Sequence, residues 1–405
     1  MMKRRQFVRM CGAACVAPLA SRNLAGQQTA ADKFDLIVRG GRVIDPSQSL
    51  DRIADVAVSD GKIAAITPEL DPRRARRVIN VPGSLVTPGL IDLHVHGFQG
   101  VSHWGVDLDR FCLGRGVTTA VDAGTSGADS FEGFRRYIVN PAKTRVLAFL
   151  NISRIGLIAR PGELTDMRMV DVAAAVEAAM KHADLIVGIK VRCSGSLAGP
   201  NELEAVRRTR AAADKIGKPI MMHVGRHETP LEYLVEELRP GDMMTHSFRT
   251  EGGVIGPDGR VPGYIKRAAE RGVRFDIGHG NGGFSFAAME QALKEGLPPS
   301  SISSDIHSYS TMGPVFDLPT TMSKMLMLGL SLQKVIELTT IEPARAIHWE
   351  RLLGSIAPGR IADIAVFDLV KGKFPLIDSS REVREASEKL VPVLALRDGK
   401  LTPGA

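Results

Sequence analysis

The pattern of apolar and polar positions divides the chain into a middle region and two ends that resemble each other. Residues 34–88 form short apolar runs separated by turn residues, and the Asp60-Gly61 step between two such runs is a strong hairpin signal. Residues 354–400 show the same pattern of short apolar runs, in which Val, Ile, Leu and Ala are interrupted by Pro-Gly and Asp-Gly. The pattern predicts one small β-sandwich domain assembled from both chain ends, residues 32–88 and 349–405.

The middle of the chain, residues 89–348, alternates apolar strands with amphipathic helices. We expect eight strands, at 89–95, 118–123, 145–152, 185–192, 219–224, 242–247, 274–278 and 302–306. Expected helices between them include 170–182, 202–216, 231–238, 264–271 and 286–295. Eight strand–helix units in this span match the roughly 250 residues of a (β/α)8 barrel. The predicted fold class is therefore α/β, a TIM barrel with a small β-sandwich domain.

A doubly wound open sheet is the alternative to the barrel. Such sheets that bind dinucleotides open a helix after the first strand with Gly-x-Gly-x-x-Gly. The chain has no such motif at that place, so the barrel is favoured.

The first 25 residues have the composition of an export signal. A basic stretch at 3–5 precedes a short apolar run at 10–20, which is too short to span a bilayer. Arg4 and Arg5, with Phe7 two positions on, resemble a twin-arginine signal, so we expect a periplasmic protein without a membrane span. An exposed cytosolic basic tail is the alternative.

The basic net charge is largely a property of this leader. The 405 residues include 52 Lys and Arg against 45 Asp and Glu, a formal net charge of +7. Five of the bases and no acid lie in residues 1–25, which leaves a net charge of +2 on the rest. We therefore expect no nucleic-acid partner. Outside the leader the cysteines are Cys112 and Cys193, which we expect to be buried thiols.

The candidate chemistry lies where the predicted barrel strands end. His94 and His96 close the first strand two positions apart, so both imidazoles face the same side. The other candidates end strands four to eight: Lys190, His223, His246, His279 and Asp305. A single strand-end histidine is more often structural than a ligand. Because barrels build active sites at the C-terminal ends of their strands, this convergence favours one shared site.

These motifs, with the Pro-Gly-Leu-Ile-Asp-Leu-His-Val-His stretch at 88–96, resemble the amidohydrolase superfamily over nearly the whole mature chain. The resemblance implies a binuclear metal centre. Its ligands would be His94, His96 and Asp305 on one ion, His223 and His246 on the other, and Lys190 bridging both as its N6-carboxylated form. A carbamate suits this place because an ammonium between two dications is strongly repelled. Zn²⁺ is the expected ion, and Mn²⁺, Co²⁺ or Fe²⁺ would also accept these ligands.

Residues 190–194, 276–286 and 304–307 are similar to the amidohydrolase/deacetylase group, which is related to dihydroorotases and D-aminoacylases. Known members of that group cleave acetyl groups from small α-substituted carboxylates. The resemblance implies attack on an amide or ester by a hydroxide shared between the ions, with Asp305 moving the proton. Arg192 and His279 are the expected substrate contacts. A structural ion pair for Arg192 and a supporting role for His279 stay open.

Two other functions fit the same sequence. A cyclic amidase of the dihydroorotase or hydantoinase type would keep the site and change the substrate. A non-catalytic periplasmic barrel would keep the fold without the metal. An enzyme of either kind would act on a small-molecule substrate. The sequence leaves open whether the chain forms a homo-oligomer.

Overall fold

The expected parallel barrel is present in the middle of the chain. The computed structural model describes residues 34–158 and 162–402, so the predicted leader lies outside the described residues. A parallel sheet follows chain order through β6 (Leu90–Val95), β7 (Val117–Gly127), β8 (Arg145–Asn151), β9 (Ile186–Cys193), β10 (Ile220–Val224), β11 (Met243–Thr245) and β12 (Arg274–Phe275). These strands coincide with seven of the eight that the sequence predicts.

Residues 301–306 take the eighth position and close the sheet without forming a regular strand. Ser301 bridges to Asp276 on one side, and Ile306 bridges to Val95 of β6 on the other. The His96 amide donates to the Ile306 carbonyl at 3.1 Å. The predicted barrel fold is therefore confirmed, with an eighth strand that is reduced to these few pairings.

Helices surround the sheet. The longer ones are α3 (Val172–Lys181), α5 (Glu202–Ile216), α6 (Leu231–Glu236), α7 (Gly263–Glu270), α8 (Phe286–Lys294), α9 (Leu318–Met327), α10 (Leu332–Glu337) and α11 (Ile341–Ala346). Single helical turns lie at α1 (Leu108–Phe111), α2 (Phe131–Phe134) and α4 (Gly195–Ala198). Helix α5 has the bounds that its pattern predicts, because Ala205, Thr209 and Ala213 recur at helical spacing and are buried.

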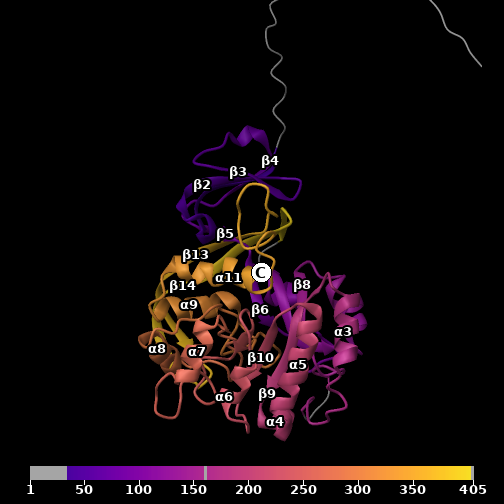
Figure 1. Cartoon of the computed structure of the whole chain (residues 1–405). Helices are drawn as coiled ribbons and strands as arrows, with labels where there is room; N and C mark the ends of the chain where they lie inside the picture. The colour runs from indigo at the N-terminus through magenta and orange to yellow at the C-terminus, as the bar shows by residue number, and fades with distance from the viewer. Residues whose placement is uncertain (1–33, 159–161, 403–405) are drawn as a thin grey trace, which may run out of the picture.

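The two chain ends form one further sheet. Its N-terminal strands are β1 (Phe34–Asp45), β2 (Leu50–Ser59), β3 (Lys62–Thr67), β4 (Ala75–Asn80) and β5 (Leu85–Pro88), and its C-terminal strands are β13 (Ile364–Ile377), β14 (Val383–Arg397) and β15 (Lys400–Thr402). The strands join in the order β15-β14-β13-β5-β1-β2-β3, with β4 beside β1. In Figure 1 the indigo strands β2–β4 lie above the barrel. The predicted hairpin is confirmed, with Ser59 opposite Lys62.

The two ends of the chain meet where β5 pairs with β13. Val86 lies opposite Val366 in this antiparallel pair. Both side chains are fully buried, and they share one core with Val43 and Val56 of the N-terminal strands and Ile364 of β13. Neither end could bury this apolar surface alone, which is why the small domain needs both.

β13 and β14 extend well beyond the apolar runs that predicted them. Their ladder continues to the pair Ile377–Val383, past the apolar runs at 362–367 and 393–396. This far half lies along the barrel wall (Figure 1). The Leu390 amide donates to Ser323 Oγ of α9 at 3.0 Å, and the Phe286 amide at the start of α8 donates to Asp378 at 2.9 Å. The hairpin thus joins the small sheet to the barrel.

Candidate metal centre

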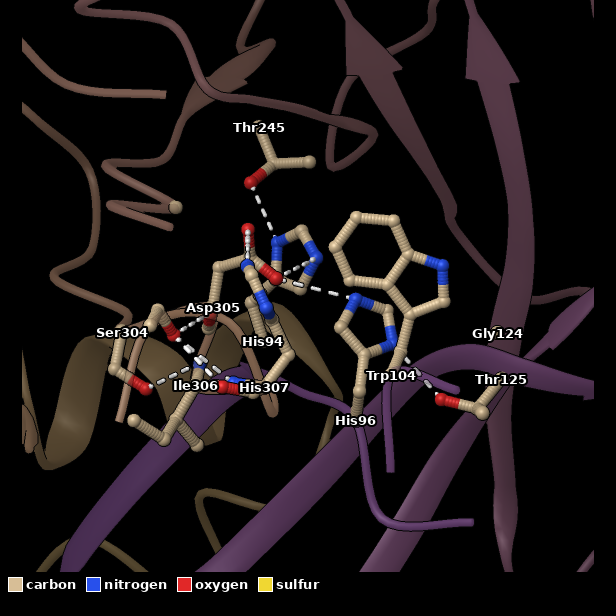
Figure 2. Close-up of polar contacts among 12 residues, drawn as sticks. His94, His96, Trp104, Gly124, Thr125, Thr245, Ser304, Asp305, Ile306 and His307 are labelled. Atoms are coloured by element: carbon tan, nitrogen blue, oxygen red, sulfur yellow. Dashed lines mark hydrogen bonds and ion pairs between the residues drawn. The ribbon is translucent and has the colours of Figure 1, made fainter. Parts of the chain in front are cut away.

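His94, His96 and Asp305 converge at the C-terminal end of the barrel. The Nε2 atoms of His94 and His96 lie 3.3 and 3.1 Å from Oδ1 of Asp305. One ligand atom from each residue falls within 4.8 Å of the other two, and all three side chains are buried. Figure 2 shows both imidazoles turned toward this carboxylate. The geometry is that of a site for one cation.

A second group of side chains lies directly beside this cluster. The His246 ring centroid is 4.9 Å from that of His94 and 4.4 Å from that of His223. Lys190 Nζ lies 3.4 Å from Nε2 of His94. The structure therefore brings together all six side chains that the sequence suggests as metal ligands. His94, Lys190 and His223 lie on β6, β9 and β10, His96 and His246 directly follow β6 and β11, and Asp305 lies at the eighth position.

Hydrogen bonds fix which ring nitrogen of each histidine faces the site. Thr245 donates its hydroxyl proton to Asp276 at 2.8 Å, so its oxygen accepts from Nδ1–H of His94 at 2.9 Å. His246 Nδ1 can only donate to the Gly278 carbonyl, at 2.5 Å. His96 Nδ1 lies 2.8 Å from Thr125 Oγ1 (Figure 2). In His94 and His246 the lone pair is on Nε2, the nitrogen that metal ligation requires.

The arrangement at Asp305 fits a cation. Its Oδ1 is buried and has no hydrogen-bond partner within the described part of the chain. The lone pair of His94 Nε2 points at this oxygen, and two acceptors at 3.3 Å repel each other unless a cation lies between them. Burial also lowers the pKa of His94 well below its usual value and that of His96 to about 3, so both rings are neutral, as ligands must be.

Lys190 is buried among groups that favour its neutral form. Its side chain is fully enclosed, and this burial lowers its pKa to about 7, although Asp305 opposes the shift. Gly124 makes room for its stem, because a Cβ at that position would lie 2.7 Å from Lys190 Cγ. A neutral amine at this place is the nucleophilic form that reacts with CO₂.

Two of the candidate ligands have an unusual backbone. His246 has φ of 64° and Asp305 has φ of 48°, the left-handed region that non-glycine residues seldom adopt. Gly280 lies against Asp305, since a Cβ there would fall 2.1 Å from its Oδ2. Strain of this kind, which costs about 1–3 kcal/mol per residue, is typical of functional sites.

A small cavity opens above the candidate ligands. Its volume is about 200 Å³, below the 300–1,000 Å³ usual for drug-sized ligands, which indicates a small substrate. The lining residues are His96, Trp104, Arg192, His223, His246, Arg249, Asn281, Gly282, Gly283, Asp305, His307 and Tyr309. His94 and Lys190 are not among them and lie beneath.

Comparison with known proteins agrees with this geometry. Residues 85–402 match the model of the amidohydrolase family. The chain belongs to the amidohydrolase family. It is similar to a deacetylase of Agrobacterium fabrum, with 37% identity over 83% of each chain. It is also similar to a deacetylase of Enterococcus faecalis, with 32% identity over 91% of this chain and 99% of that one.

Solved structures agree with the family assignment. One described as an adenine deaminase has a TM-score of 0.86 and 31% identity, and it covers 92% of this amidohydrolase and 100% of its own chain. Another, described as a dihydroorotase, has a TM-score of 0.83 and 34% identity, with 91% and 98% covered. This chain is thus an enzyme that hydrolyses C–N bonds with divalent metal, and the non-catalytic barrel fits less well.

Arg192, an expected substrate contact, forms an ion pair in this amidohydrolase. Its Nε and Nη2 donate to the two carboxylate oxygens of Glu163 at 2.7 and 2.9 Å. Its guanidinium also lies over the Trp104 ring, 5.9 Å from the centroid. Arg192 lines the cavity, but its charge is already matched. The ion pair that the sequence left open is therefore the arrangement observed.

His279, the other expected contact, does not line the cavity of this amidohydrolase. It is fully buried, and its Nδ1 lies 2.9 Å from the Gly280 carbonyl. Its Nε2 accepts from Lys324 Nζ at 2.7 Å, and the same ammonium donates to the Pro314 carbonyl at 2.8 Å. Both ring nitrogens thus have protein partners, which corresponds to the supporting role left open by the sequence.

Several residues of the site are not among the substrate contacts expected from the sequence. Trp104 and His307 line the cavity with their rings 4.6 Å apart, and Arg249 is a second cavity arginine. The position of Arg249 is a signal that could have been used, since it follows ligand His246 by three residues in a loop at the barrel mouth. Cys112 and Cys193 are free and buried, as expected. In the described residues no helix is long and apolar enough to span a membrane.

Proposed function

We propose that this amidohydrolase is a deacylase that removes an acyl group from an amide or ester of a small carboxylate-bearing substrate. The observation that carries the proposal is the set of acceptor atoms facing one another around Asp305, beneath a small cavity that two arginines also line. Two relatives with high coverage are named deacetylases. The cationic lining supports a substrate with a negative charge.

The donor set supports a centre of two divalent cations, with Zn²⁺ as the expected ion. His94, His96 and Asp305 would hold one ion, His223 and His246 the other, and Lys190 would reach both as its N6-carboxylated form. Such cations supply Lewis acidity, which lowers the pKa of water and polarises a carbonyl.

Asp305 is the group in this site that would move the proton. Its Oδ1 faces the two imidazoles, while its Oδ2 lies 3.8 Å from Nε2 of His307. One oxygen is thus placed for ligation and the other for proton transfer at the cavity. Burial raises the pKa of this carboxyl to about 6, and a cation held at Oδ1 would oppose that shift.

A cyclic amidase is the second candidate, because one similar solved structure is described as a dihydroorotase. The curated dihydroorotases match less of the chain, with 35% identity over 32% of it in one case. The deacylase therefore has broader support.

The deciding experiment is a substrate panel. Protein loaded with Zn²⁺ and bicarbonate would be assayed on N-acetyl amino acids and O-acetyl 2-hydroxy acids of both configurations. Dihydroorotate, hydantoin and adenine would be the comparison substrates. We expect acetate release from the acylated carboxylates. Turnover of a comparison substrate without any acetate release would overturn the deacylase.

We also propose that the protein is exported to the periplasm. The paired arginines and the short apolar run of the first 25 residues support this proposal. Cell fractionation of the full chain and of an Arg4→Lys, Arg5→Lys variant would test it, and a variant found in the periplasm at the wild-type level would contradict it. Light scattering on the same preparations would decide whether the enzyme is a homo-oligomer.

A further inference from the structure

Two arginines line the cavity, and they differ in their partners. Arg192 uses two of its N–H groups on Glu163, and side-chain exposures of 10% and 2% place this pair out of solvent. A bidentate pair of this kind satisfies the guanidinium fork and cancels its charge. A substrate carboxylate at Arg192 would have to compete with Glu163, or accept a weaker contact with the outer edge of the guanidinium.

Arg249 carries an unmatched charge. Its Nη1 donates to the backbone carbonyl of Val224 at 2.8 Å. Its Nε is buried without an acceptor, and no acid of the described residues forms an ion pair with it. The nearby Glu251 instead pairs with Arg226, at 2.5 Å.

The environment of Arg249 makes an anionic ligand favourable. Burial lowers its pKa and Glu251 opposes that shift, but an arginine keeps its proton in proteins. A half-buried guanidinium with an unused N–H is costly until an anion pairs with it.

We propose that Arg249 binds the carboxylate of the substrate, while the Arg192–Glu163 pair positions the cavity wall. The inference rests on the proposed deacylase function, since it names the residue that recognises the carboxylate. Val224 directly follows His223, so the carboxylate lies on the His223–His246 side of the cavity. Trp104 lies against His307 and His96 in the cavity lining and offers an apolar surface to the rest of the substrate.

The proposal predicts that loss of Arg249 impairs the binding of substrates that carry a negative charge. Arg249→Met should raise the KM for an N-acetyl amino acid roughly ten- to a hundredfold, the loss expected for a charge-assisted hydrogen bond. The kcat/KM for the corresponding carboxamide should change less than about twofold, since that substrate has no charge to lose. Arg249→Lys keeps the charge but loses the planar guanidinium. Its KM for the N-acetyl amino acid should lie between those of the wild type and Arg249→Met.

The matched control is Arg226→Met. Arg226 is exposed, lies on the neighbouring loop and does not line the cavity, so its loss removes a nearby positive charge without a cavity contact. Its KM for the carboxylate should rise only slightly, because the Glu251 that loses its partner near Arg249 is more than half exposed and screened by solvent. Equal losses on both substrates in a folded Arg249→Met protein with normal metal content would overturn the proposal, as would unchanged KM for the carboxylate.

A binding measurement separates this inference from the proposed function. Calorimetry with lactate and lactamide would compare the metal-loaded wild type, Arg249→Met and Arg226→Met. We expect lactate binding to be lost only in Arg249→Met, and lactamide binding to be equal in all three. If the wild type hydrolyses no acylated carboxylate but shows this pattern, the deacylase fails and the carboxylate site stands. Lactate binding that survives in Arg249→Met, or is absent in the wild type, overturns the site.

Discussion

The two halves of the barrel hold their candidate ligands in different ways. In the first half, β6 to β9 are six to eleven residues long, and His94 and Lys190 lie on these regular strands. In the second half, β10, β11 and β12 have five, three and two residues, and the eighth position forms only isolated bridges. His246 and Asp305 follow these short pairings with left-handed backbones. The ladder therefore holds His223 on β10 but does not by itself position His246 and Asp305.

In the second half, buried carboxylates replace much of the missing ladder. Asp276 accepts hydroxyl protons from Thr245, Ser301 and Ser303 at 2.6 to 2.8 Å. Asp92 of β6 accepts from the amide of Ser304 at 3.0 Å and also from its hydroxyl. Networks whose members are all satisfied make a local structure rigid. Side-chain hydrogen bonds thus support the backbone strain at the ligands of this half.

The largest effect is expected for a ligand of the first half. Lys190→Ala should abolish turnover, because it removes the side chain that would bridge the two groups of imidazoles, while the regular β9 keeps the fold. Acetate or propionate, which could take the place of the carbamate, should restore part of the activity. The measurement is kcat with and without these acids, and wild-type turnover in the variant would refute the bridge.

Asp305→Asn tests the second half. The amide keeps the size of the side chain but loses the charge and the proton acceptor, so kcat should fall by two or more orders of magnitude. Circular dichroism and thermal unfolding should show a folded protein, since the serine–carboxylate network is intact. A normal rate would show that Asp305 does not move the proton.

A matched pair of threonines sharpens the comparison. Thr245 and Thr125 both bond to Nδ1 of a candidate ligand, but only Thr245 also donates to the Asp276 network. Thr245→Val should weaken metal affinity roughly ten- to a hundredfold, as measured by chelator competition. Thr125→Val, on the eleven-residue β7, should lose less. Equal losses of metal affinity in the two variants would mean that both halves of the barrel depend equally on side-chain hydrogen bonds to hold their ligands.

The smallest expected effect is a pH dependence of stability that arises from Lys324, the partner of His279. Burial lowers the pKa of Lys324 to about 7 from 10.5, so the unfolded chain binds its proton more tightly. Its contribution to stability is therefore full above pH 10.5 and is lost as pH falls toward 7. Relative to Lys324→Met, the unfolding free energy of the wild type should rise with pH by up to about 1.4 kcal/mol per unit in this window.

Urea unfolding at pH 7.5, 8.5 and 9.5 would measure this slope. Lys334→Met on α10 is the control for the loss of a lysine, since Lys334 pairs with Glu337 at the surface. Parallel curves for the wild type and Lys324→Met would contradict the expectation.

The sequence was most informative where local pattern and function coincide. The strand ending in His94 and His96 and the helix 202–216 were predictable, because an alternating or helical pattern needs no knowledge of distant partners. The strand-end positions indicated seven candidates for one shared site, and the resemblance to the amidohydrolase superfamily selected the six of them that meet. The last three strands were expected at 242–247, 274–278 and 302–306, but in the structure they shrink to three residues, two residues and isolated bridges, and their hydroxyl–carboxylate support was not predicted.

What the sequence did not reveal depends on distant partners. Arg192 could have faced substrate or any acid, and nothing in its neighbourhood indicated Glu163, 29 residues earlier. The far half of β13–β14 was missed because residues such as Lys371 and Glu388 give it a polar, exposed pattern. Its fit against α9 exists only in the folded molecule. Arg249 shows the same limit, since its lack of an acidic partner is a property of three dimensions.

The junction between β5 and β13 sets an order of events during synthesis. Ser84 bonds to Asp368, and Asp45 bonds to Ser355, 310 positions later. The ribosome therefore completes every barrel strand before the N-terminal strands receive their last neighbour. Until then β5 presents an open edge, the kind of surface through which nascent chains associate wrongly. A chaperone that shields residues 34–88 would be of most use in this interval, and prematurely terminated chains should aggregate through that edge.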